Sequence, residues 1–261
     1  MLVVLFCAVA ASIALSIAWL IVRAVGDGGW TDVVWTLSVG LIGALAALWP
    51  APGAVLGRQG LVSVLIGLWA VRLGGYIALR TVRSDTPDPR YERFKHEWGG
   101  WGLKAWGLLM VQAATVVVLV ISLRAAAIRP SADLGWRDAL AALIVLAAVG
   151  GEALADRQMA AFRRDSDHMG KVADTGLWAW SRHPNYFFEW TVWLAWPVMA
   201  LDPGHPSGWL SLLAPIQMWW LLNHVSGVPM LEAQMLKSRP QAYRAYQARV
   251  SRFFPFPPKT R

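Results

Sequence analysis

The chain has 261 residues, of which 56% are hydrophobic and only 15% are charged, and it carries a formal net charge of +8. Soluble domains contain about 45–50% apolar and about 25% charged residues, so a soluble globular protein is excluded, as are a disordered chain, a coiled coil and a collagen. The single cysteine, Cys7, excludes an intramolecular disulfide framework and a cysteine-based metal cluster. The composition indicates an integral membrane protein.

Seven apolar stretches are candidates to cross a bilayer, which requires about 20 residues in a helix. The first, 2–22, contains no charge and is too long for a signal peptide, so we predict an uncleaved span. The last two are short and are joined by Pro-Gly-His-Pro. In chain order the other six are 32–49, 61–79, 105–123, 139–156, 186–201 and 209–225. The sequence therefore predicts an all-α, polytopic membrane helix bundle of about seven transmembrane helices.

Lys and Arg gather in three segments, which follow the third, fifth and seventh predicted spans. Six, five and seven of the 24 basic residues lie at 80–104, 157–182 and 237–261. These segments share one side of a seven-span chain, and the positive-inside rule makes that side cytoplasmic. We therefore expect the N-terminus outside, the C-terminus in the cytoplasm and a single multi-pass domain, 1–261, in the inner (plasma) membrane. This distribution explains most of the charge without a nucleic-acid partner.

Ionisable residues inside a span are costly in hydrocarbon and by default mark function. In the expected orientation, all those found here lie in the cytoplasmic half, which favours a pocket open to the cytosol over a channel. The alternative is structural ion pairing, for example of the acids with Arg163. The residues are Arg72 in the third span, Glu152 and Asp156 in the fifth, Glu189 in the sixth, and His224 beside Asn223 in the seventh.

The segment before the sixth span reads Ser-Arg-His-Pro-Asn-Tyr at 181–186. Pro184 favours a helix start and leaves the following Asn and Tyr in the first turn, where unpaired N–H groups and the positive helix dipole favour an anion. Lys171 and Arg182 would add charge for a phosphate. For His183 we prefer a positioning or phosphate-contact role, because no second His or Cys lies at metal-ligand spacing.

The tail carries Tyr243, Tyr246 and Val250 at helical spacing, after Pro240 at a plausible helix start. Glu232 precedes them. One interpretation is an amphipathic helix on the membrane surface. The other is a lid that closes the cytosolic mouth over a cofactor. The sequence leaves both open.

Several stretches together carry a resemblance to a known superfamily. They are Ser-Arg-His-Pro-Asn-Tyr-Phe-Phe-Glu-Trp (181–190), Gly-Val-Pro-Met-Leu-Glu (227–232), Tyr-x-x-Tyr (243–246), Phe-Pro (254–255), Asp-Pro-Arg-Tyr (88–91) and Trp-x-x-Arg-x-x-x-Tyr (69–76). The chain resembles the membrane reductases that contain the steroid 5α-reductase C-terminal domain, and in particular their uncharacterised bacterial branch. The resemblance implies seven spans, NADPH in a cytosol-facing cavity, and a lipophilic substrate that enters from the bilayer.

The resemblance also implies roles for individual residues, with 2–79 on the substrate side and 80–261 on the cofactor side. Two departures stand out: Phe188 replaces a usual Gly, and Trp69 replaces the catalytic Tyr and cannot donate a proton at neutral pH. Implied substrate-side residues are Trp35, Trp69 and Arg72, and catalytic candidates are Tyr76, Asp32 and Glu189. Implied cofactor contacts are Arg83, Glu152 (where the family has Asn), Asp156, Arg163, Lys171, Asn185, Tyr186, Glu189, His224, Tyr243 and Tyr246; no metal is implied.

The leading hypothesis is an NADPH-dependent oxidoreductase acting on a carbonyl-conjugated double bond in a steroid- or isoprenoid-like lipid. Hydride transfer to an enone puts negative charge on the carbonyl oxygen, so a hydrogen-bond donor is needed there, either Tyr76 or a protonated Asp32. Glu189 and Asn185 would hold the nicotinamide amide. The sequence does not predict an oligomeric state.

Two other hypotheses remain. An S-adenosylmethionine-dependent methyltransferase of the isoprenylcysteine or phospholipid type shares the Arg-His-Pro start and the Glu…Tyr-x-x-Tyr tail. Such enzymes usually lack the Asn after the Pro and the Glu four residues later, so Asn185 and Glu189 favour the reductase. The third hypothesis is a non-catalytic membrane scaffold in which the polar residues are purely structural.

Overall fold

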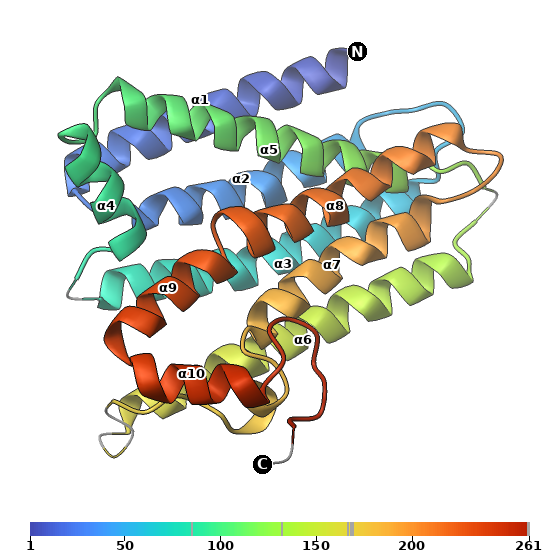
Figure 1. The fold of residues 1–261 in the computed structure, drawn as a ribbon. Helices are drawn as coiled ribbons and strands as arrows, with labels where there is room; N and C mark the ends of the chain where they lie inside the picture. The colour runs from blue at the N-terminus through green and yellow to red at the C-terminus, as the bar shows by residue number, and fades with distance from the viewer. Residues whose placement is uncertain (85, 132, 166, 168–169, 260–261) are drawn as a thin grey trace. The chain divides into compact units, whose positions relative to one another are not determined.

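The computed structural model describes residues 1–259 except 85, 132, 166, 168 and 169, and Figure 1 shows its helices. Outside the loops the described chain is helical, apart from one isolated bridge between Ser181 and Ser251. The all-α prediction is therefore confirmed. In order, the elements are α1 (Leu2–Val25), α2 (Gly29–Leu48), α3 (Leu56–Arg83), α4 (Pro89–Trp98), α5 (Leu103–Ala127), α6 (Trp136–Arg164), η2 (Gly176–Ala179), α7 (Pro184–Ala200), η3 (Pro206–Leu212), α8 (Leu213–Trp220), η4 (Leu221–Val225), α9 (Val228–Ser238) and α10 (Pro240–Arg249).

Five helices in the described part of the chain, α1, α2, α3, α5 and α6, are long and apolar enough to cross a membrane. The protein is thus a multi-pass membrane protein, and the first five predicted spans each correspond to one of these helices. The sixth corresponds to α7, which has 17 residues and contains Pro197. The seventh is divided into the 3₁₀ segment η3, the eight-residue α8 and the π segment η4. A total of seven spans and the orientation of the termini stay predictions.

The chain forms two compact units, which are described separately. Unit 1 comprises residues 1–142 and 196–214, and unit 2 comprises residues 143–195 and 215–261. In unit 1, α1, α2, α3 and α5 lie side by side (Figure 1). Small residues allow α2 and α3 to approach closely, because a Cβ on Gly40 would lie 2.2 Å from the Cβ of Ala70. Close backbone approach at glycine and alanine is typical of helix packing in membranes.

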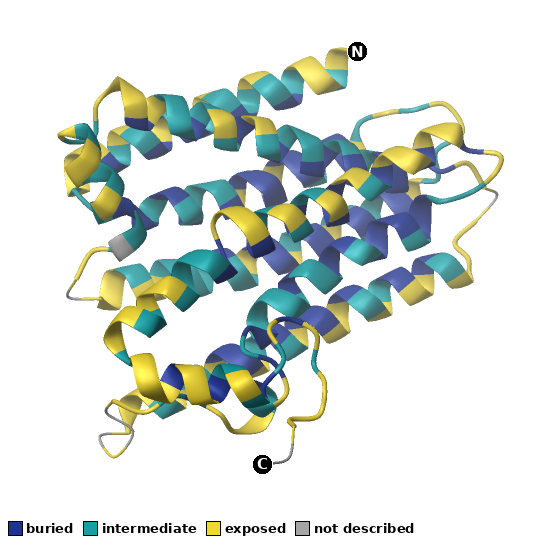
Figure 2. Cartoon of the chain, viewed as in Figure 1, coloured by how far each residue is buried: buried dark blue, intermediate teal, exposed yellow. Residues whose placement is uncertain are grey.

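Most of α1 faces away from the protein. Only 22% of its most apolar stretch is buried, and Figure 2 shows its surface as largely exposed or intermediate. The exposed side chains include Leu5, Val9, Ile13 and Leu20, whereas Ala11, Leu15 and Ala18 are fully buried. An apolar exposed face of this length is stable only against lipid, which agrees with a position at the periphery of the unit.

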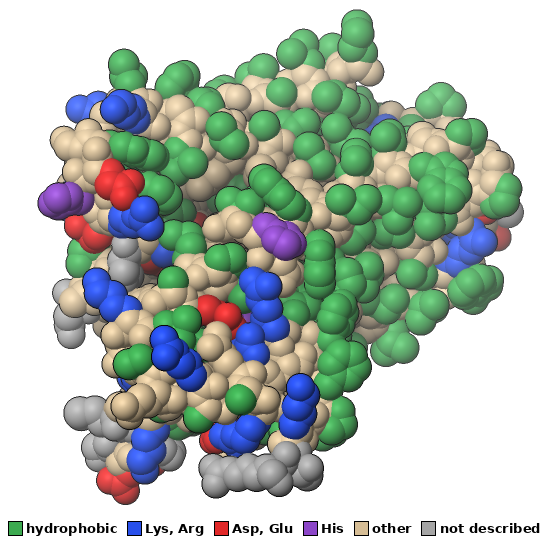
Figure 3. Space-filling view, in the orientation of Figure 1, with side chains coloured by type: hydrophobic (Ala, Val, Ile, Leu, Met, Phe, Trp, Pro, Cys, Tyr) green, Lys and Arg blue, Asp and Glu red, His purple; other side chains and the backbone are tan. Residues whose placement is uncertain are grey.

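In unit 2 the helical path changes at η4, where the Ser226 amide donates to the Leu221 carbonyl 2.9 Å away in a π turn. Gly227 follows, and a Cβ there would lie 2.4 Å from the Leu222 carbonyl oxygen, so only glycine fits. This turn leads into α9 and α10. Lys and Arg side chains gather over these two helices, whereas hydrophobic side chains cover the long helices of unit 1 (Figure 3).

Candidate functional site

Three buried carboxylates come from two helices of unit 2. Glu152 and Asp156 lie one turn apart on α6 and are 3% and 6% exposed, so they share one face of the helix. Glu189, on α7, is 5% exposed and accepts a hydrogen bond from Trp193 Nε1 over 3.0 Å. Carboxylates buried in an apolar membrane protein are costly, which makes this region the candidate site.

Contact between Gly151 and Phe188 brings these helices together. A Cβ on Gly151 would lie 2.4 Å from Phe188 Cε1, so the ring occupies the space that a side chain at 151 would need. Glu152 and Glu189 each follow one of the two contact residues, and they therefore come from facing helices. The contact also explains why Phe188 is tolerated where the resembling family usually has Gly. The small residue of this contact, Gly151, lies on α6, and the large ring of Phe188 lies on α7.

Replacing Gly151 with alanine is expected to destabilise the protein by about 1–3 kcal/mol, because the added methyl group overpacks the contact with Phe188. Thermal unfolding in detergent measures this loss. Gly150→Ala is the matched control, because a Cβ there meets nothing within 4 Å. Equal melting temperatures for the two variants would show that Phe188 moves aside without cost.

The first turn of α7 forms as predicted. Pro184 is its first residue, and Asn185 and Tyr186 follow it. The Tyr186 ring stacks on the His183 imidazole at a centroid distance of 5.8 Å, and the Phe187 amide donates to the His183 carbonyl over 3.0 Å. Asn185 and Glu189 are thus one turn apart on a helix whose start is well defined.

A single carboxylate, Glu232 on α9, joins the loop before α7 to the tail. Its Oε1 accepts hydrogen bonds from Arg182 Nε (2.8 Å), His183 Nε2 (3.3 Å) and the Tyr243 hydroxyl (3.2 Å). Its Oε2 accepts from Gln247 Nε2 over 3.1 Å. We call these five residues the Glu232 node. It holds the side chains of Arg182 and His183 in place against α9.

Protonation within the node follows from burial and charge. Burial raises the pKa of Glu232, but the hydrogen bonds from His183 and Arg182 outweigh it and lower this pKa to about 2. Burial lowers the pKa of His183, against the pull of Glu232. Because an ionised carboxylate only accepts, His183 Nε2 carries the proton of the neutral ring. Burial, with the charge of Glu232, raises the pKa of Tyr243 well above its ordinary value.

The predicted face of α10 is buried against protein. Tyr243, Tyr246 and Val250 form one cluster, which contradicts the interpretation of this face as a membrane-surface helix. The Tyr246 hydroxyl donates to the Trp178 carbonyl over 2.5 Å. The side chains packed against the cluster are Val172, Met235 and Leu236. Both tyrosines proposed as cofactor contacts therefore use their hydroxyls within the protein.

The loop between α6 and α7 is also tied to α6. Trp178 Nε1 donates to the Ala155 carbonyl over 3.0 Å, and the Leu177 amide donates to Gln158 Oε1 over 2.9 Å. These contacts hold the loop beside Asp156. Three further predicted cofactor contacts of unit 2, Arg163 near the end of α6, Lys171 in the loop and His224 in η4, have exposed side chains.

In unit 1, Asp32 is held by the Asp-Pro-Arg-Tyr segment. Its Oδ2 pairs with Arg90 Nη2 at 2.6 Å, and its Oδ1 accepts from the Tyr91 hydroxyl at 2.7 Å. Burial, together with the charge of Asp32, raises the pKa of Tyr91 well above its ordinary value. Asp32 accepts a hydrogen bond in both contacts. Neither contact therefore requires the protonated Asp32 that was proposed as the hydrogen-bond donor to the substrate carbonyl.

The other predicted residues of unit 1 lie on α2 and α3. The guanidinium carbon of Arg72 lies 5.6 Å from the centre of the Tyr76 ring. Trp69 is fully buried, and Trp35 Nε1 donates to Thr115 Oγ1 over 3.1 Å. Arg83 ends α3 and is exposed. A common pocket for Arg72 and the carboxylates of unit 2 stays a prediction.

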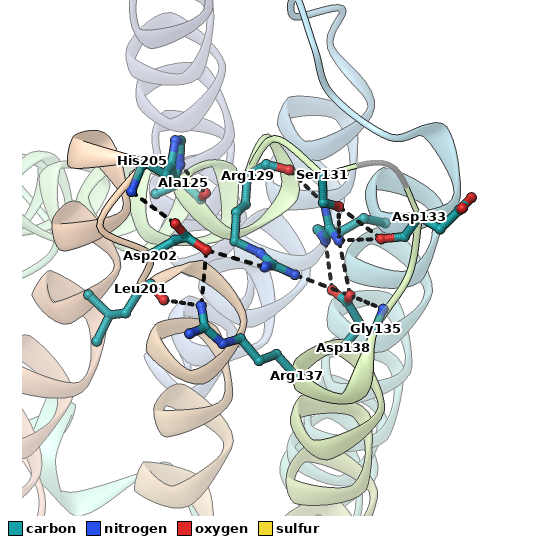
Figure 4. A network of polar contacts seen from close by, with 12 residues as sticks. Ala125, Arg129, Ser131, Asp133, Gly135, Arg137, Asp138, Leu201, Asp202 and His205 are labelled. Atoms are coloured by element: carbon teal, nitrogen blue, oxygen red, sulfur yellow. Dashed lines mark hydrogen bonds and ion pairs between the residues drawn. The ribbon is translucent and has the colours of Figure 1, made fainter.

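One buried network in unit 1, shown in Figure 4, was not predicted from the sequence. Arg58, fully buried, donates to Asp138 Oδ1 (2.6 Å) and Oδ2 (3.0 Å) and to the Arg129 carbonyl (2.6 Å). Arg129 and Arg137 also lie 3.8 and 3.3 Å from the Asp202 carboxylate. Arg129 Nη2 also lies 3.3 Å from Asp138 Oδ2, so both carboxylates are paired with arginines and the network holds helix ends together.

These features define a helical multi-pass membrane protein with buried carboxylates on two facing helices. The chain belongs to a family described as "Protein of unknown function (DUF1295)", whose sequence model matches residues 18–250. An uncharacterized protein of Schizosaccharomyces pombe is 32% identical over 87 residues, which cover 31% of this chain and 23% of that protein. The chain thus matches under a quarter of that relative's length. No solved structure matches.

Proposed function

We propose that the protein is a membrane-embedded, NADPH-dependent reductase of a carbonyl-conjugated double bond in a lipophilic, steroid- or isoprenoid-like substrate. The observation that carries the proposal is the pairing of α6 and α7. It sets Glu152 and Asp156 against the helix that carries Asn185 and Glu189, all within an apolar protein. The resemblance to the steroid 5α-reductase group supports the same assignment, including seven spans with a cytoplasmic cofactor side.

The side chains present suit this cofactor. An amide at 185 and a carboxylate at 189 offer a donor and acceptors to a carboxamide, and the exposed Arg163 and Lys171 offer positive charge to phosphates. When bound, NADPH supplies a hydride. The protein's part is to orient both molecules, exclude water and direct a hydrogen-bond donor at the substrate carbonyl, where negative charge develops; Tyr76 is the proposed donor.

A methyltransferase that uses S-adenosylmethionine is the second candidate, because residues of the motif that this chain shares with such enzymes are hydrogen-bonded to one another here. Of the residues in this shared motif, Arg182, His183, Glu232 and Tyr243 belong to the Glu232 node, whereas Pro184, Tyr186 and Tyr246 lie outside it. These contacts join a loop to a tail and would serve either chemistry. Asn185 and Glu189 lie outside the node, so the residues that distinguish the two classes favour the reductase.

Nucleotide binding tests this proposal. NADPH, and not S-adenosylmethionine, is expected to raise the melting temperature of the purified protein in detergent. Glu189→Gln is expected to weaken NADPH at least tenfold, about 1.4 kcal/mol, because it removes a charged acceptor. The matched control is Glu97→Gln, an exposed carboxylate on α4 paired with Arg93.

Two other outcomes are informative. A shift with S-adenosylmethionine alone would replace the reductase by the methyltransferase. If neither nucleotide shifts a folded sample, the scaffold hypothesis is favoured. In that case Asn185→Ala and Glu189→Gln would lower stability without affecting any ligand.

A further inference from the structure

We propose that unit 1 holds a phospholipid in a groove separate from the candidate site. The groove has a volume of about 130 Å³ and lies between α1, α5, η3 and the end of α2. The surface that faces the groove is entirely apolar: Arg124 and Ser207 are among the lining residues but turn no polar atom into it, and the apolar residues include Val3, Val4, Cys7, Ile121, Ile128 and Leu210. Since α1, α2 and α5 are membrane-length helices, a hydrocarbon chain is the matching occupant.

Arg124 is the independent observation that points to a headgroup. Its Nη1 donates to the carbonyls of Ala46 (2.9 Å) and Trp49, and its Nη2 donates to the Pro50 carbonyl (3.2 Å). These acceptors are the last carbonyls of α2 and its extension, so the side chain caps that helix. All three are neutral. Among the described residues no carboxylate pairs with Arg124, so its charge is not neutralised within the protein.

The guanidinium also has donors left for a ligand. It carries five N–H groups, and the three carbonyls use three of them. Ser207 Oγ, at the same edge of the groove, lies 3.3 Å from the His205 ring and has lone pairs and a proton that can be redirected. A phosphate offers several anionic oxygens, for which arginine is a preferred partner.

The groove lies at the depth that a phospholipid requires. α1 begins at Leu2, α2 ends at Leu48 and α5 ends at Ala127, so three spans terminate at the same level. The Trp49 ring packs 5.4 Å from Phe6, as an aromatic residue at a membrane interface does. Arg124 lies midway along the α5 wall, and from Arg124 to Val120 this wall extends for about 6 Å toward the hydrocarbon. With a phosphate beside Arg124, the first part of one acyl chain lies along this length.

Val4 lines the groove and is 42% exposed, so a thiol at this position provides a direct readout. Val4→Cys is made in the background of Cys7→Ala, because Cys7 is the only cysteine in the chain and its thiol is buried. The delipidated full-length variant in dodecyl maltoside is labelled with a maleimide. Dioleoylphosphatidylglycerol is expected to slow labelling at least fivefold. Dodecanol, a chain without phosphate, and inorganic phosphate, a headgroup without a chain, are each expected to change the rate by less than twofold.

The role of Arg124 is tested by substitution. Arg124→Gln is expected to abolish the protection by phosphatidylglycerol, and Arg124→Lys to keep part of it. Arg23→Gln is the matched control: Arg23 lies at the other end of α1, over the Trp19 ring. It should leave protection unchanged.

Because Arg124 caps α2, its loss can disturb folding, so a second variant leaves it intact. Val4→Trp fills the groove from an exposed position, and Leu41→Trp adds the same bulk at an exposed position of α2 outside the groove. In native mass spectrometry, wild type and Leu41→Trp should retain a phospholipid that Val4→Trp loses. The proposal fails if phosphatidylglycerol does not protect the thiol of Val4→Cys, if dodecanol protects it equally, or if protection is unchanged when Arg124→Gln is added.

Discussion

Replacing Arg58 with alanine is expected to lower the free energy of unfolding by about 3–5 kcal/mol, the largest effect that we predict for this protein, because it removes the closest partner of the buried Asp138 carboxylate and leaves it with Arg129 at 3.3 Å and the Gly135 amide. Both side chains of the Arg58–Asp138 pair are inaccessible, at 0% and 2% exposure, and the distance is 2.6 Å. Arg58 also satisfies the Arg129 carbonyl and the Ser131 hydroxyl. Thermal unfolding of the purified protein in detergent measures the loss.

Two further variants interpret this result. One removes both charges of the Arg58–Asp138 pair together, and the other breaks an ion pair at the surface. Arg58→Met combined with Asp138→Leu removes both charges with similar volume, and we expect it to be much less destabilising than either single change. Arg93→Ala removes an exposed pair with Glu97, and we expect it to change stability little because water screens the pair. If Arg58→Ala costs no more than Arg93→Ala, the network of Figure 4 does not hold the helix ends.

Arg58 and Asp138 show why hydropathy found the spans but not this network. The predicted spans began at 61 and 139, whereas α3 begins at Leu56 and α6 at Trp136. A hydropathy pattern treats a charge as the end of a span, so two charges that neutralise each other inside the protein are assigned to loops. Their separation of 80 residues leaves no local signal that they meet.

Local backbone chemistry was more predictive for the candidate site. Proline fixes its own φ and lacks an N–H, so Pro184 and Pro240 marked the starts of α7 and α10 correctly. Helical spacing alone identified the buried face that contains Tyr243. The Glu232 node could not be derived in this way, because Arg182 and Glu232 are 50 residues apart. The π segment η4 also has no simple sequence signal.

Replacing Glu232 with alanine is expected to have the second largest effect. Arg182 and His183 both donate to its Oε1, and Gln247 donates to its Oε2. Charged hydrogen bonds of this kind contribute about 1.5–3 kcal/mol each when a partner is removed, so we expect a loss of at least that size at pH 7. Thermal unfolding measures the loss, and Asp174→Ala is the control, since Asp174 pairs with Arg249 at an exposed site.

The pH dependence makes the Glu232 prediction specific. The pKa of Glu232 is about 2 in the folded protein against an ordinary 4.5, so its contribution is complete above pH 4.5 and is lost as the pH falls toward 2. His183, whose pKa is lowered from 6.5, adds a loss of stability below pH 6.5, and this loss is larger in the alanine variant because Glu232 raises the pKa of His183 in the wild type. The difference between wild type and Glu232→Ala is therefore expected to grow as the pH falls from 7 to 5 and to shrink by pH 3. A difference that is unchanged at pH 3 would mean that the charge of Glu232 does not stabilise the node, and that its contacts act only by filling space.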